Sequence, residues 1–127
     1  MDALEWVGLT DKIKSKPAML SGGECQRVAI ARSMVKKPKI VLADEPTANL
    51  DSKNSHHILQ TMKNLNKELN TTFIFATNDE KVMQYLKRII SMEDGKVVLY
   101  STELENAGKV LKGPHYFKPN LKDIIYE

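Results

Sequence analysis

Two adjacent carboxylates follow a short apolar run near the centre of the chain. Residues 40–43 are Ile, Val, Leu and Ala, and Asp44 and Glu45 come directly after them. A β-branched run without polar alternation predicts a strand buried on both faces of a parallel sheet, and ligands bind at the carboxyl ends of such strands. One carboxylate can hold Mg²⁺ directly or through water, and the other can orient or deprotonate a water molecule. A solvated strand end before a turn explains these two residues equally well.

A second chemical feature is the segment at residues 21–24, which reads Ser-Gly-Gly-Glu. It fits a capping box, with Ser21 at the N-cap and Glu24 reaching back from the third helical position. Gly22 and Gly23 leave backbone N–H groups uncovered at the positive end of the helix dipole, which suits a phosphate oxygen. A bare Ser-x-x-Glu pattern is more often an ordinary helix cap, so both explanations stay open for this segment alone.

The polar turn at residues 48–52 is a third feature, in which Asp51 or Ser52 can cap the next helix. By itself it carries little information.

Proline, glycine and cap residues divide the chain into the elements that would position these segments. We expect a helix stopped by Gly8, a solvated loop at residues 12–17 and a helix from Ser21 to Pro38. Further along, we expect a strand at 39–43, a helix from 51 or 52 to Asn70, a strand at 72–77, a short helix around 82–86, and a hairpin of 88–92 and 96–100 about Glu93-Asp94-Gly95. This order predicts an α/β fold with parallel strands, flanking helices and a C-terminal hairpin. Residues 102–111 are predicted as one more helix, and 115–127 as a surface tail.

Length, composition and charge limit the classes of protein to which this chain can belong. The chain has 127 residues, of which 42% are hydrophobic and 28% charged, typical of one soluble globular unit. No apolar run is long enough to cross a bilayer, and the acidic N-terminus is unlike a secretory signal. The net charge of +3 is too small and too scattered to indicate nucleic acid as a partner. A single cysteine, Cys25, excludes an internal disulfide framework, so we expect a cytosolic protein.

In this order and spacing, the three segments resemble those of an ATP-binding cassette (ABC) ATPase, which has a P-loop NTPase-like fold. Residues 20–26 resemble its signature motif, residues 40–45 its Walker B strand and residues 49–52 its D-loop. The resemblance runs from about residue 4 to residue 98. The sequence of residues 42–51 is similar to that of the family branch serving lipoprotein release, macrolide export and cell-division complexes, although that branch usually has glycine in place of Ala48.

The resemblance implies roles for six residues and for ATP and Mg²⁺ as cofactors. Ser21, Gly22 and Gly23 would contact the γ-phosphate of ATP held by the opposite subunit of a head-to-tail dimer. Asp44 would serve Mg²⁺, Glu45 would polarise the attacking water, and Asp51 would bridge the two subunits. It also implies an integral-membrane permease as partner and a place at the cytoplasmic face of the membrane.

Two departures from the family pattern affect these expectations. The phosphate-binding loop Gly-x-x-x-x-Gly-Lys-Ser/Thr is not found, since the Gly-Lys pairs at 95–96 and 108–109 are each followed by valine. The family places that loop in an N-terminal half, so we expect residues 1–100 to be a partial, C-terminal ABC ATPase domain and 101–127 an extension. Asn78 stands where the family has a histidine that contacts the γ-phosphate, and asparagine cannot become cationic.

Three functional interpretations follow. The first is an ATP-binding and ATP-hydrolysing subunit of an ABC transporter, present as a fragment that is inactive alone. The second is a non-catalytic or degenerate ABC module that completes a partner's nucleotide site. The third, an ABC ATPase acting on DNA or ribosomes, is disfavoured because no long coiled-coil insertion or basic linker occurs.

Overall fold

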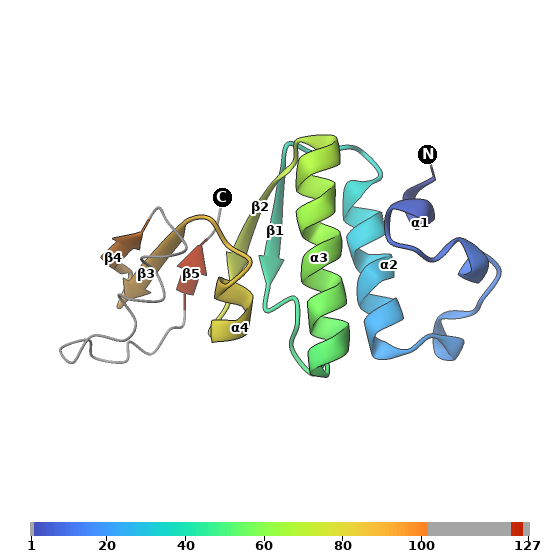
Figure 1. Cartoon of the computed structure of the whole chain (residues 1–127), viewed down its shortest axis with the longest axis horizontal. Coiled ribbons are helices and arrows are strands. Elements are labelled where there is room, and N and C mark those ends of the chain that lie inside the picture. The colour runs from blue at the N-terminus through green and yellow to red at the C-terminus, as the bar shows by residue number, and fades with distance from the viewer. Residues whose placement is uncertain (1, 102–122, 126–127) are drawn as a thin grey trace. The chain divides into compact units, whose positions relative to one another are not determined.

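The computed structural model describes residues 2–101 and 123–125 (Figure 1). Its contacts divide the chain into two compact units: unit 1 comprises Met1–Val41 and Pro46–Thr72, and unit 2 comprises Leu42–Glu45 and Phe73–Glu127. Unit 1 contains helices that pack on one another, and unit 2 contains an antiparallel sheet.

Unit 1 begins with a short helix, α1 (Ala3–Trp6), whose N-cap Asp2 accepts a hydrogen bond from the Leu4 N–H. Gly8 follows at φ 66°, a left-handed conformation that suits glycine, and the helix ends before it as predicted. Two 3₁₀ turns, η1 (Thr10–Lys12) and η2 (Pro17–Met19), flank the segment predicted as a loop.

Two longer helices, α2 (Gly22–Met34) and α3 (Ser52–Leu69), lie side by side in unit 1 (Figure 1). Asn70 ends α3 in the left-handed region at φ 52°, so the predicted stop at this residue is confirmed. Apolar side chains of both helices and of the segment after α1 form the core of this unit: Val7, Leu9, Ile30, Ala31, Met34, Ile58, Leu59, Met62 and Leu65.

Two strands, β1 (Ile40–Asp44) and β2 (Thr72–Ala76), pair with each other. At one end the Thr72 N–H donates to the Lys39 carbonyl, and at the other the Glu45 N–H donates to the Ala76 carbonyl, both at 2.8 Å. Because both strands advance together between these bonds, they are parallel. The prediction of parallel strands joined through a helix is confirmed.

The burial predicted for the first strand was wrong. In β1, Ile40 is 58% exposed and Leu42 77%, whereas Phe73 and Phe75 in β2 are 2% and 4% exposed. Every second side chain of β1 is exposed, so among the described residues one face of this strand lacks a covering element. Apolar composition predicted burial, but burial needs covering elements as well.

The rest of unit 2 contains the short helix α4 (Glu80–Met83) and the hairpin of β3 (Ile89–Glu93) and β4 (Lys96–Ser101). The hairpin turn is Asp94-Gly95, with φ 48° and 73°, and positive φ at both central residues is what a tight two-residue hairpin needs. This hairpin was predicted. A third strand, β5 (Asp123–Ile125), pairs antiparallel with β3 inside the segment predicted as a tail, and sequence analysis missed it. The helix predicted at residues 102–111 lies outside the described residues.

Candidate functional site

Five of the six predicted site residues fall into two turns, one in each unit, and the sixth, Asp51, is the N-cap of α3. We call residues 21–24, at the start of α2, the glycine turn, and residues 44–45, at the end of β1, the acid turn. Ser21, Gly22, Gly23 and Asp51 belong to unit 1, and Asp44 and Glu45 to unit 2.

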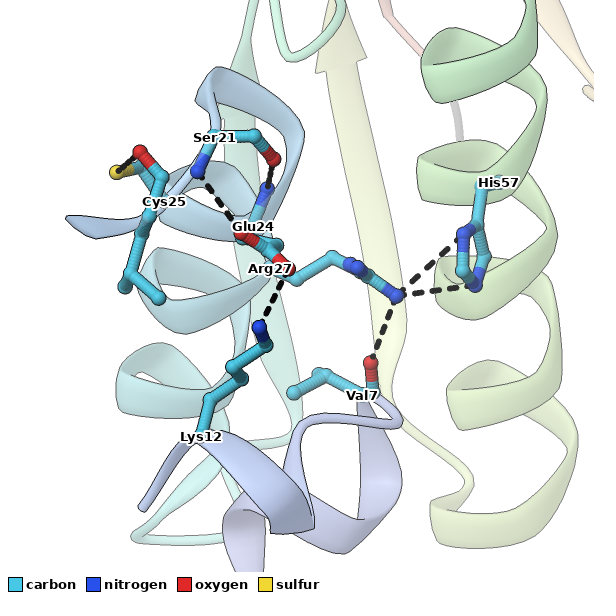
Figure 2. Close-up of polar contacts among 8 residues, drawn as sticks. Val7, Lys12, Ser21, Glu24, Cys25, Arg27 and His57 are labelled. Carbon is cyan, nitrogen blue, oxygen red and sulfur yellow. Dashed lines mark hydrogen bonds and ion pairs between the residues drawn. The ribbon is translucent and has the colours of Figure 1, made fainter. Parts of the chain in front are cut away.

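The glycine turn is a complete capping box, as predicted (Figure 2). The Glu24 N–H donates to the Ser21 hydroxyl at 3.2 Å, and the Ser21 N–H donates to the Glu24 carboxylate at 2.8 Å. The first N–H groups of a helix have no partner within it, so no bond inside α2 uses those of Gly22 and Gly23. Gly23 is buried, so the expectation of an uncovered glycine was wrong for this residue. Ser21 and Gly22 are exposed to solvent.

The charge around Glu24 supports the ionised form of this side chain. The hydrogen bond from the Ser21 N–H lowers the pKa of the Glu24 carboxyl, burial opposes that effect, and the nearby Lys12 and Arg27 charges lower the pKa further. Lys12 Nζ lies 3.7 Å from the carboxylate (Figure 2). The capping box is therefore maintained at neutral pH.

Arg27 connects the helix of the glycine turn to its neighbours (Figure 2). One guanidinium nitrogen lies 3.4 Å from the Val7 carbonyl and 3.3 Å from His57 Nε2. Burial lowers the pKa of His57, and the charges of Arg27, His56 and Lys53 lower it further. A neutral imidazole keeps one nitrogen free to accept a hydrogen bond, so the contact with Arg27 suits the neutral ring.

Asn54, which is hydrogen-bonded to Asp51, lies against Gly23 of the glycine turn. Asp51 caps α3, accepting from the Asn54 N–H at 2.7 Å with one oxygen and from the Asn54 side-chain amide at 3.1 Å with the other. A carboxylate only accepts, so the Asn54 amide nitrogen faces Asp51 and its Oδ1 faces away. A Cβ added to Gly23 would come within 2.5 Å of that Oδ1, whereas one added to Gly22 would meet only Leu50 at 3.6 Å.

The acid turn presents two carboxylates in different surroundings. Asp44 is exposed, and among the described residues no hydrogen bond or ion pair involves it. Glu45 is half-buried and stands at φ 44°, an uncommon value for a residue with a side chain. Its carboxylate accepts from the Thr77 hydroxyl at 3.3 Å and from the Asn78 N–H at 3.2 Å.

The carboxylates of the acid turn suit Mg²⁺ that keeps several waters better than they suit a metal ion held entirely by protein side chains. Among the described residues, no group of three or more His, Cys, Asp or Glu side chains is placed to hold a metal ion. Mg²⁺ keeps several waters and is often bound by one or two carboxylates together with substrate phosphates. The exposed carboxylate of Asp44 is suited to that arrangement.

Sequence reasoning missed two residues that belong to these turns. Asn54 could have been found, because an asparagine three residues after the capping Asp51 is within local reach. Thr77 could not, because it lies 32 residues from Glu45 and only strand pairing brings the two together. The prediction for Asn78 concerned its side chain, whereas the structure shows its backbone N–H in use.

Comparison with known proteins places these turns in a family. Residues 1–48 match the family model of the ABC transporter. The lipoprotein-releasing system ATP-binding protein LolD of Pseudoalteromonas translucida is 47% identical over 103 residues, which are 81% of this chain and 44% of that protein. The chain belongs to the ABC transporter ATP-binding family. The macrolide export ATP-binding/permease protein MacB of Chlorobaculum tepidum is 44% identical over 95 residues, 75% of this chain and 14% of that protein.

Solved structures of ABC cassettes agree with the fold. An ATP-binding cassette in its ADP conformation aligns over 88% of this chain and 44% of that one, with 27% identity and a TM-score of 0.81. A dimeric cassette in a post-hydrolysis state, bound to ADP and Pi, aligns over 79% of this chain and 44% of that one, with 42% identity and a TM-score of 0.66.

These relatives confirm the family and the lipoprotein-release and macrolide-export branch indicated by residues 42–51. The chain spans less than half the length of the LolD relative and of these two solved cassettes. None of the described helices combines the length and hydropathy needed to span a bilayer.

Proposed function

We propose that this ABC-family chain serves as an ATP-binding and ATP-hydrolysing subunit of a transporter of the lipoprotein-releasing or macrolide-export type. In this proposal two ATPase subunits face head to tail around the nucleotide and act with an integral-membrane permease at the cytoplasmic face of the membrane. ATP and Mg²⁺ are the cofactors.

The glycine turn carries the proposal. Because Ser21 accepts a hydrogen bond in the capping box, its hydroxyl proton is still available for donation. Together with the N–H groups of the exposed Gly22 and the buried Gly23, it forms a set of donors at the positive end of a helix of 13 residues. Such a set suits the γ-phosphate of ATP held by the opposite subunit.

The acid turn would act on the nucleotide of its own subunit. Asp44 would hold Mg²⁺, which neutralises phosphate charge when bound. Glu45 would polarise the attacking water, and one lone pair on each carboxylate oxygen remains for this after the bonds from Thr77 and Asn78. Asp51 would bridge the subunits while it also holds Asn54.

The chain lacks the phosphate-binding loop, so the variant Glu45→Gln tests the proposal with Mg²⁺ and ATP in a complex with a second ATPase chain that contains this loop. Removing the base while keeping the side-chain shape should slow hydrolysis by about 10²- to 10⁴-fold, the usual contribution of a general base. The ATP-bound complex should then accumulate, and light scattering should show a higher mass after ATP is added.

Glu93→Gln is the matched control, because Glu93 is an exposed acid at the end of β3, outside both turns. It should behave as the wild type does. If the complex shows no ATP-dependent association or hydrolysis with either wild type or Glu45→Gln, the proposal is contradicted.

We also propose that hydrolysis is slow because Asn78 replaces a histidine. Asn78→His should raise kcat in a complex that hydrolyses ATP, since a histidine side chain can contact the γ-phosphate and carry a charge. An unchanged or lower kcat would contradict this.

A second candidate is a non-catalytic module that completes a partner's nucleotide site. The observation that favours it is the contrast between a fully formed glycine turn and Asn78 beside the acid turn. A partner ATPase whose activity rises on adding wild-type chain, but not on adding Ser21→Ala, and equally on adding Glu45→Gln, would support this candidate over the first.

A further inference from the structure

Glu45 is hydrogen-bonded to three successive residues at the end of β2. Its backbone N–H donates to the Ala76 carbonyl at 2.8 Å. Its two carboxylate oxygens accept from the Thr77 hydroxyl and from the Asn78 N–H, at 3.3 and 3.2 Å. The left-handed φ of 44° at Glu45 turns the backbone out of the strand direction. The carboxylate is therefore held at both oxygens.

The Thr77 hydroxyl donates its proton to Glu45. Thr77 is fully buried, at 0% exposure, and its Oγ1 accepts from the Asp79 N–H at 3.1 Å. A hydroxyl has a single donor, and the Asp79 bond leaves that donor free. The proton is then directed to Glu45, because a buried hydroxyl without an acceptor would lose the hydrogen bond that it makes to water in the unfolded chain.

The side chain of Asn78 takes no part in this arrangement. Only its backbone N–H reaches Glu45, and any residue except proline supplies such a group. The departure from the family histidine at this position leaves the support of Glu45 unchanged.

We propose that Thr77 is a positioning residue for Glu45: its hydroxyl, with the Asn78 N–H, orients the carboxylate toward the attacking water whatever side chain stands at position 78. This inference rests on the proposed function, since only a water-polarising role makes the orientation of Glu45 matter for catalysis. The hydrogen-bond arrangement itself can be tested without hydrolysis.

Amide hydrogen exchange, followed residue by residue in the 127-residue chain by NMR, measures the arrangement. Thr77→Val keeps the branched shape and removes the hydroxyl, so exchange at Asp79 and at Asn78 should quicken by roughly fivefold to tenfold, as expected for one lost hydrogen bond. Thr77→Ser keeps the hydroxyl and should restore both rates.

Two further variants separate positioning from a merely structural role. Glu45→Ala should quicken exchange at Asn78 and leave Asp79 unchanged, because Asp79 donates to Thr77 and not to Glu45. Asn78→Ala and Asn78→His should leave exchange at Asp79 unchanged. If Thr77→Val does not fold, the Glu45→Ala and Thr77→Ser results still decide the matter.

The proposal is overturned by any of three results. These are an unchanged Asn78 rate in Glu45→Ala, a Thr77→Ser variant with the fast exchange of Thr77→Val, and an increase spread evenly over β2 and α4 in Thr77→Val. In the ATP-hydrolysing complex, Thr77→Val should lower kcat by about tenfold with KM unchanged, and Thr77→Ser should recover it. A complex without any hydrolysis would contradict the proposed function, while the exchange rates would still test the support of Glu45.

Discussion

The glycine turn and the acid turn each contain residues that we propose to act on ATP, but the two turns are built in different ways. The bonds that shape the glycine turn join Ser21 and Glu24, three residues apart. The bonds that shape the acid turn join Glu45 to residues 32 and 33 positions away. The glycine turn needs only the first turn of α2, whereas the acid turn needs β1 and β2 to be paired.

This difference has an entropic cause. A capping box orders residues that are already neighbours in the chain, so closing it restricts little additional chain. Bringing Glu45 to Thr77 closes a loop that contains all of α3, and the cost of that closure must be offset by strand pairing and apolar burial. We therefore expect core substitutions in unit 2 to disrupt the acid turn before the glycine turn.

The largest expected effect comes from Phe73→Ala in β2. Phe73 is 2% exposed, and truncating a buried phenylalanine costs about 3–5 kcal/mol of unfolding free energy. Urea unfolding measures the loss, and amide exchange should rise more at Asn78 than at Glu24. The control Leu42→Ala changes a side chain that is 77% exposed and should cost under about 0.5 kcal/mol. An equal rise in exchange at both turns would contradict the expectation that the acid turn depends more on the core of unit 2.

Gly23→Ala should have the next largest effect, because the added methyl group would clash with a residue of another helix, α3. The new Cβ would overlap the Asn54 side chain, and overpacking of this kind costs about 1–3 kcal/mol. Gly22→Ala is the matched control and should be neutral or slightly stabilising, since its Cβ meets only Leu50 at 3.6 Å. Thermal unfolding measures both.

Asn54→Gly should relieve most of the Gly23→Ala penalty, because it removes all three Asn54 atoms that the new Cβ would meet. A double variant as unstable as the sum of the two single variants would show that Asn54 is not the cause.

Ser21→Ala should cost about 1 kcal/mol, the usual effect of losing an N-cap hydroxyl. The acid turn should keep its exchange rates, because no bond of Glu45 involves residues of the glycine turn. Urea unfolding together with exchange at Asn78 checks both parts. Faster exchange at Asn78 in this variant would mean that the two turns depend on one another.

The smallest effect is a pH dependence within the glycine turn. The folded-state pKa of Glu24 is lowered from the ordinary 4.5, so the unfolded chain binds more protons in this range. The contribution of Glu24 is therefore present above pH 4.5 and is lost as the pH falls through the folded pKa. Unfolding free energies of wild type and Glu24→Gln should converge on acidification, and parallel curves would contradict this.

Sequence reasoning succeeded where the relevant contacts are local. The Ser21 capping box, the end of α3 at Asn70 and the Asp94-Gly95 hairpin turn each depend on the conformational preferences of a few adjacent residues. The pattern of residues 20–26, 40–45 and 49–52 also indicated the family, because those spacings are particular to it.

It failed where the outcome depends on distant partners. The apolar residues 40–43 predicted a strand covered on both faces, but Leu42 is exposed. The prediction failed because apolar composition does not specify whether another element covers a strand. Strand β5 was missed because three residues in a segment without periodicity become a strand only by pairing with β3.

By itself the sequence determined the caps, the turns and the residue types available for phosphate and metal chemistry, because these depend on φ, ψ and hydrogen bonds within a few residues. Only the tertiary structure decided that Thr77 and the Asn78 N–H hold Glu45, and that Asn54 lies against Gly23. The physical reason is that such contacts need two segments, far apart in the chain, to be brought together by packing and strand pairing.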